Sequence, residues 1–287
     1  MGLFLDDGSR KLRSGWVIAV FCAIAAGSYG LCSGVVSLFG LHPREPLTLD
    51  DPYLFFTTVV MLVAATSATV PCVLFLNAEA GLPRAGALGN LLKGLGLGAG
   101  LVLLTVFIPV AVGQAPLGFS SDGAAALLEA ALLQAVVLVP TSVGEELLLR
   151  GVLLRQLAKG TRAWLAVLLT AATFGVMHLL NPDATWVAAL NVALVGVWFG
   201  LLALRFTLWA AIGAHVAWNF FEGFVLGQPV SGINPGPSLF VGPIVARGFF
   251  SGGAFGPEAS GLTGVLLVIA VIWTLTPLLT NGSSRAQ

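Results

Sequence analysis

AALLQAVVLVPTSVGEELLLRGVLL, residues 130–154, contains two adjacent glutamates, Glu145 and Glu146, between long apolar runs. Charge is scarce elsewhere, because only 9% of the 287 residues are charged. A carboxylate within an apolar membrane helix costs about 3 kcal/mol, so such residues are usually retained for function. The stretch therefore indicates both a membrane fold and the first place to look for a site.

The composition around this stretch is that of a membrane protein. The chain is 57% hydrophobic and its mean hydropathy is +0.97. Crossing a bilayer takes about 20 apolar residues. We therefore predict an all-α, polytopic transmembrane helical bundle, forming a single integral membrane domain over residues 1–287. About eight spans are expected, at approximately 15–40, 53–77, 88–112, 124–158, 163–181, 185–204, 207–226 and 261–280.

The fourth expected span, 124–158, is too long for one simple crossing. It is expected either to break near Pro140 or to run long and tilted. The glycines Gly94, Gly96, Gly98 and Gly100 lie in the third span, where small residues let helices approach closely. The loop 227–260, rich in Gly and Pro, could be a lid, a re-entrant segment or a connector, and a connector is the simplest interpretation.

The distribution of positive residues predicts the orientation. Short cytoplasmic loops are enriched in Lys and Arg. Most basic residues fall on one side of the predicted bundle, which places both termini in the cytoplasm: Arg10, Lys11, Arg13, Arg84, Lys93, Arg155, Lys159, Arg162 and Arg205, with Arg44 and Arg247 as exceptions. The net charge is zero and no basic cluster suggests nucleic acid as a partner. The Ala-, Gly- and Leu-rich composition favours a bacterial inner membrane.

Two of the three histidines, His178 and His215, lie within expected spans. Glu145 and His178 stand at about the same distance, ~20–25 Å, from the turn at 159–162, so a helical hairpin would bring them level. His215, on a third span and ten residues past Arg205, is expected ~15 Å from the same side, somewhat shallower but still within the membrane. Three helices can therefore direct Glu, His and His into one polar cavity, because each would be expensive alone in hydrocarbon.

Spacings of four residues add partners on one helix face. Glu146 and Arg150 fit a buried ion pair, which leaves Glu145 free to face the cavity. The Phe174 ring can wall the His178 imidazole. His215 and Asn219 are also four residues apart, and they point two polar groups the same way.

This set of groups is suited to hydrolysis. A glutamate near a histidine can deprotonate water, and a His–Asn pair can donate hydrogen bonds to an oxyanion. The same groups, His178, His215 and Glu145, could instead hold zinc as a two-His, one-Glu site. The spacing leaves both alternatives open. The His-Glu-x-x-His motif of zinc proteases is absent.

Glu145-Glu146-x-x-x-Arg150, Phe174-x-x-x-His178 and His215-x-x-x-Asn219 together resemble the motifs of the CPBP (ABI) family, the type II CAAX prenyl endopeptidases and their bacterial relatives. The resemblance covers about 124–226. It implies an intramembrane glutamic or metallo-endopeptidase acting on membrane-associated, CAAX-like or bacteriocin-leader substrates. In it, Glu145 and His178 would activate water. His215 and Asn219 would stabilise the oxyanion, supported by Glu146 and Arg150, and zinc would be the one cofactor to consider.

Two further classes remain to be weighed. The first is a non-catalytic membrane immunity or scaffold protein of the same fold, which would work by binding. The second is a transporter that relays protons through its buried Glu and His, which would predict repeat symmetry between the two halves of the chain. The expected partners are the lipid bilayer and a membrane-associated protein or peptide.

Overall fold

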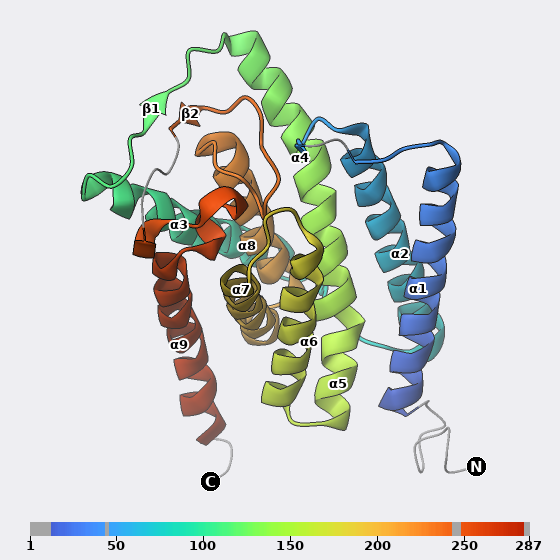
Figure 1. The fold of residues 1–287 in the computed structure, drawn as a ribbon. Coiled ribbons are helices and arrows are strands. Elements are labelled where there is room, and N and C mark those ends of the chain that lie inside the picture. Colours follow the sequence, from blue (N-terminus) through green and yellow to red (C-terminus); the bar gives the residue numbers. More distant parts are fainter. Residues whose placement is uncertain (1–12, 44–45, 243–247, 284–287) are drawn as a thin grey trace.

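The computed structural model describes residues 13–43, 46–242 and 248–283, and its backbone is helical almost throughout (Figure 1). Arg10, Lys11, Arg44 and Arg247, which entered the charge argument, lie outside the described residues. The α-helices are α1 (Ser14–Leu38), α2 (Pro52–Leu76), α3 (Ala87–Ala111), α4 (Ala124–Glu146), α5 (Leu154–Gly160), α6 (Ala163–Met177), α7 (Trp186–Arg205), α8 (Leu208–Phe220) and α9 (Gly261–Ser283).

Short elements join these helices. The π-helical turns η1 (Leu147–Leu153) and η3 (Phe221–Val225) extend α4 and α8. The 3-10 turns are η2 (His178–Leu180), η4 (Gly248–Phe250), η5 (Gly253–Phe255) and η6 (Pro257–Ala259). The strands β1 (Gly118–Phe119) and β2 (Phe240–Val241) pair antiparallel, Gly118 opposite Val241.

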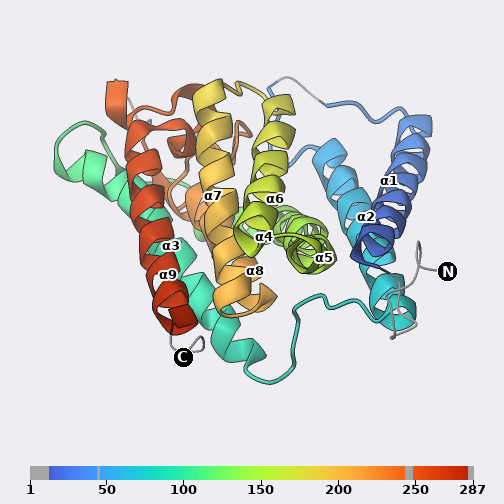
Figure 2. The ribbon, with the colours of Figure 1, turned by 90° about the horizontal axis from the view of Figure 1, so that it is seen from below.

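The predicted all-α membrane fold is confirmed. Six helical segments of the described chain are long and apolar enough to cross a membrane: α1, α2, α3, the continuous helix 124–160, 163–180 and α7. The other two expected spans are not among these six, and α8 has only 13 residues before its π turn. α1 begins and α9 ends at the same end of the bundle (Figure 1). Seen from below, α4 and α5 lie between the α1–α2 pair and the group α6 to α9 (Figure 2).

The long fourth helix does not break at Pro140. α4 runs through the proline, and the hydroxyls of Thr141 and Ser142 donate to the carbonyls of Val137 and Leu138 at 2.8 Å each. These bonds go to the carbonyls that follow Val136, the residue whose carbonyl lacks its i+4 partner because Pro140 has no N–H. The irregularity lies instead in η1, directly after the two glutamates, where a π turn is followed by a kink at Gly151, whose backbone is not helical (φ −74°, ψ −116°).

Close packing of α3 against α8 rests on glycines. A Cβ added at Gly94 would lie 2.1 Å from the Ala210 carbonyl oxygen, and one at Gly98 would lie 2.1 Å from that of Ala214. At Gly96 and Gly100, two residues along the helix from these contacts, an added Cβ meets nothing within 4 Å. The expected role in helix packing therefore holds for Gly94 and Gly98. The close contact that they allow positions α8, the helix that carries His215.

Gly98→Ala is expected to destabilise the protein by about 1–3 kcal/mol, because the new methyl group must push α8 away from α3. Gly96→Ala on the same helix is the matched control. It adds the same atom in open space and gains helix propensity, so it should be neutral or slightly stabilising. Thermal unfolding of the detergent-solubilised variants measures both, and equal melting temperatures would contradict the packing role.

Candidate active site

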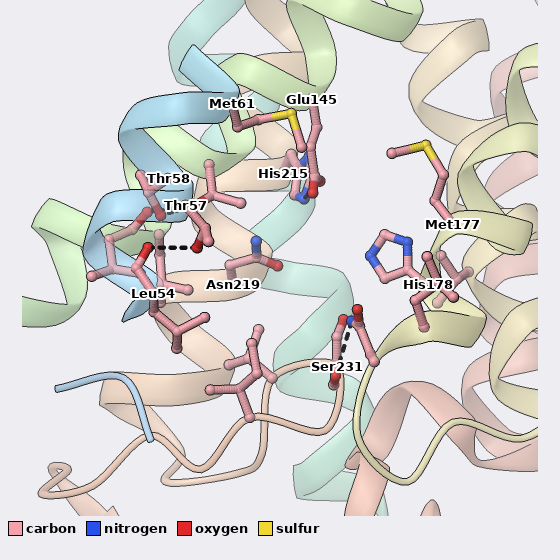
Figure 3. Close-up of a pocket in the computed structure, with 18 of the residues that line it drawn as sticks. Leu54, Thr57, Thr58, Met61, Glu145, Met177, His178, His215, Asn219 and Ser231 are labelled. Carbon is pink, nitrogen blue, oxygen red and sulfur yellow. Dashed lines mark hydrogen bonds and ion pairs between the residues drawn. The ribbon is translucent and has the colours of Figure 1, made fainter. Parts of the chain in front are cut away.

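A cavity of about 450 Å³ lies inside the bundle, and the predicted site residues Glu145, Phe174, His178, His215 and Asn219 line it. α4, α6 and α8 contribute these side chains, and α2 supplies a wall of Leu54, Thr57, Thr58 and Met61 (Figure 3). Val230, Ser231, Ile233 and Glu258 of the loop 227–260 also line the cavity. This loop is therefore part of the cavity wall and more than a connector.

Glu145 and His215 meet in this cavity. The Glu145 Oε2 atom lies 3.6 Å from His215 Nε2, and the Glu145 side chain is 14% exposed. The Glu145 carboxylate can therefore contact both the imidazole and any water in the cavity. The sequence placed Glu145 level with His178, whereas in the structure Glu145 contacts His215 from α8.

Glu146 lies behind this pair and is fully buried. Its Oε1 atom accepts hydrogen bonds from Arg150 Nη1 at 2.8 Å and from His215 Nδ1 at 3.0 Å. A carboxylate only accepts, so Nδ1 of His215 carries a hydrogen and the ring is held with Nε2 toward Glu145. The ion pair suggested by the four-residue spacing is present, and it also orients the histidine.

Aromatic rings enclose the charged groups. The Phe199 ring stacks on His215 with centroids 4.9 Å apart, and the Phe174 ring lies edge-on to it at 5.8 Å. The Arg150 guanidinium lies 4.4 Å from the Phe174 ring centre. Gly196 leaves room for the guanidinium, because a Cβ atom at this position would lie only 2.9 Å from Arg150 Nη2. The rings fix the ion pair and the imidazole in a low-dielectric wall.

His178 lies on the other side of the cavity from Glu145 and His215 (Figure 3). His178 is the C-cap residue of α6, and its Nδ1 atom lies 2.8 Å from the Phe174 carbonyl oxygen. Because a carbonyl only accepts, Nδ1 carries the hydrogen and the neutral ring offers Nε2 as an acceptor. The Phe174 ring contacts the imidazole edge-on at 4.5 Å, as its spacing predicted.

Asn219 follows His215 by one helical turn and faces the same cavity (Figure 3). Its Nδ2 donates to Ser142 Oγ at 3.1 Å, and this hydroxyl in turn donates to Leu138. The bond fixes the amide orientation and leaves the second Nδ2 hydrogen for another acceptor.

The residues suggested as zinc ligands do not form a three-ligand set as they lie. Within the described part of the chain, no group of three or more His, Cys, Asp or Glu side chains is close enough to hold a metal ion. Glu145 and His215 approach each other, and His178 is across the cavity. The arrangement does not fit the suggested zinc site, so no step below runs through a metal.

Among the cavity residues that sequence reasoning missed, Trp218, Ser231 and Glu258 form a connected group. Trp218 Nε1 donates to Glu222 Oε2 at 3.0 Å and to Glu258 Oε1 at 3.1 Å, and Ser231 Oγ donates to Glu258 Oε2 at 2.6 Å. Only the rarity of acidic residues in an apolar chain could have singled out Glu258, which lies in a loop with no periodic pattern.

Comparison with known proteins bears on these residues. Searches of curated proteins and of solved structures found no match to the chain. A scan of protein families matched residues 127–221 to the type II CAAX prenyl endopeptidase Rce1-like family. The match contains Glu145, His178, His215 and Asn219, the four polar groups that share the cavity. Residues 127–221 therefore form a domain of the Rce1-like type II CAAX prenyl endopeptidase (CPBP) family.

Proposed function

We propose that this protein is an intramembrane endopeptidase whose catalytic centre is the cavity between α4, α6 and α8. The observation that carries the proposal is the placement of Glu145, His178, His215 and Asn219 on one cavity within an apolar bundle. Four polar side chains facing one cavity in such surroundings have a large energetic cost unless they serve a ligand or a reaction. The family match supports peptide hydrolysis as that reaction.

In the proposed reaction Glu145 takes a proton from a water molecule, which attacks the substrate carbonyl carbon. His178 positions this water, because its Nε2 atom can accept the second water hydrogen. Asn219 Nδ2 and His215, which is held between Glu145 and Glu146, are proposed to donate to the oxyanion. As the C–N bond breaks, Glu145 returns the proton to the leaving amine.

The substrate is proposed to be a membrane-associated protein or peptide, CAAX-like or of the bacteriocin-leader type. It would reach the cavity from the bilayer or its interface. We further propose eight crossings, with α8 plus η3 and α9 as the last two, both termini in the cytoplasm, and a bacterial inner membrane as the location. The start of α1 and the end of α9 lie at the same end of the bundle, which supports an even number of crossings.

The direct test is N-terminal proteomics on membranes from cells expressing the wild type or Glu145→Gln. The wild type should generate new N-termini in membrane proteins, and the variant should not, at equal protein levels. If the two N-terminal profiles agree while a phenotype of the wild type persists in the variant, the protein works by binding, as an immunity or scaffold protein would.

The purified enzyme is expected to keep its activity after treatment with a strong zinc chelator, because Glu145 and the histidines are not gathered as ligands. Elemental analysis should find well below one zinc per chain. Loss of activity on chelation that added zinc restores would contradict the glutamate mechanism and support a metallopeptidase.

A further inference from the structure

Glu258 brings a second carboxylate to the cavity wall, from the loop that precedes α9. The residue is 5% exposed. The backbone around it is held firmly, since Asn191 Nδ2 of α7 donates to the carbonyls of Glu258 and Ser260 at 2.7 and 2.8 Å. Ser231, which donates to the Glu258 carboxylate, is itself fixed by Asn181 through its carbonyl at 3.1 Å. The acid therefore has a defined place facing the cavity.

A third carboxyl group, Glu222 of η3, lies behind Glu258. Both accept from the one indole N–H of Trp218, so the two acids are neighbours. Glu222 is fully buried, and its Oε1 atom has no hydrogen-bond partner among the described residues. Two buried acids that share one donor repel each other when both are ionised, so a positive charge placed beside them would be favourable.

No lysine or arginine balances these acids among the described residues that line the cavity, and Arg150 is paired with Glu146. Burial raises the pKa of Glu258, whereas the hydrogen bond from Ser231 and the nearby His178 and His215 act in the opposite direction. The cavity wall can therefore accommodate a positive charge, next to the groups proposed to cut the substrate.

We propose that Glu258, backed by Glu222, is a specificity residue that receives a cationic side chain, Lys or Arg, of the substrate near the bond to be cut. The inference rests on the proposed peptidase function and adds the class of substrate. An ammonium or guanidinium group would donate hydrogen bonds to the free lone pairs of the carboxylate and compensate its charge. An apolar side chain of equal length would leave both acids buried and unmatched.

The experiment uses the full-length protein in detergent and pairs of internally quenched apolar peptides. Each pair is identical except for one residue, Lys or norleucine, moved through the positions that flank the central bond. At one position, kcat/KM for the Lys peptide should exceed that for the norleucine peptide by about 10- to 100-fold, the range expected for a hydrogen bond to a charged group. In Glu258→Gln this ratio should fall to about one.

Binding is measured separately, by anisotropy of the same peptides with Glu145→Gln protein. If the protein binds the Lys peptide more tightly and Glu258→Gln removes this preference, the specificity site is supported. This holds even if the wild type cuts no peptide, in which case only the peptidase proposal fails. Glu79→Gln, an exposed acid paired with Lys159, is the matched control and should keep the ratio. Should Glu258→Gln not accumulate, Glu222→Gln takes its place and should reduce the ratio severalfold. No Lys preference at any position, or one that survives the loss of these acids, overturns the proposal.

Discussion

Glu145→Gln is expected to lower kcat by about 10²–10⁴-fold, the range that a positioned general base contributes. The amide keeps the size and the contact with His215, but it cannot take a proton from water. KM should change much less, because the cavity shape is retained. Steady-state cleavage of a quenched peptide by purified protein measures both constants.

The control lies on the same helix. Glu129 of α4 is exposed, and Glu129→Gln makes the same chemical change away from the cavity, so its kcat should stay within about twofold of the wild type. If Glu145→Gln retained more than a tenth of the wild-type kcat, Glu145 would not be the base.

Arg150→Ala is expected to destabilise the folded protein by about 3–5 kcal/mol, because it leaves the Glu146 carboxylate buried without a cation. Both side chains of the pair are 0% exposed. The change also removes the packing of the guanidinium on the Phe174 ring. Thermal unfolding in detergent, followed by size-exclusion profiles, measures the loss.

An exposed ion pair in the same chain supplies the comparison. Lys159 and Glu79 lie 3.1 Å apart, with side chains 47% and 66% exposed, and Lys159→Ala should have little effect on stability. The double variant Arg150→Met, Glu146→Leu removes both charges and should recover most of the stability. It should stay inactive, since His215 loses the acceptor that holds Nδ1. Equal effects of Arg150→Ala and Lys159→Ala would count against the buried pair.

Features set within one helix could be predicted from the sequence. Residues four apart share a helix face whatever the rest of the fold does, so the contacts Glu146–Arg150 and Phe174–His178 could be predicted from spacing. The membrane class also followed from hydropathy, because the lipid bilayer requires apolar helices however these pack against one another.

Features that join separate segments could not be derived in the same way. The bond from His215 to Glu146 depends on how α8 is seated against α4, which the glycines of α3 help to decide. Glu258 reaches the cavity through the path of an irregular loop, and no periodicity encodes such a path. The expected break near Pro140 was wrong, because a membrane helix packed among its neighbours tolerates an internal proline.

The pairing of Glu146 with Arg150 on a single helix has a consequence for biogenesis. α4 is synthesised before α8, so this charged segment must enter the bilayer before His215 exists to bind it. Since both partners lie on one face, they can neutralise each other as soon as the turn forms, and the helix is inserted as a dipole instead of two separate ions. The order of synthesis thus favours a counter-ion encoded four residues away over one supplied by a later helix.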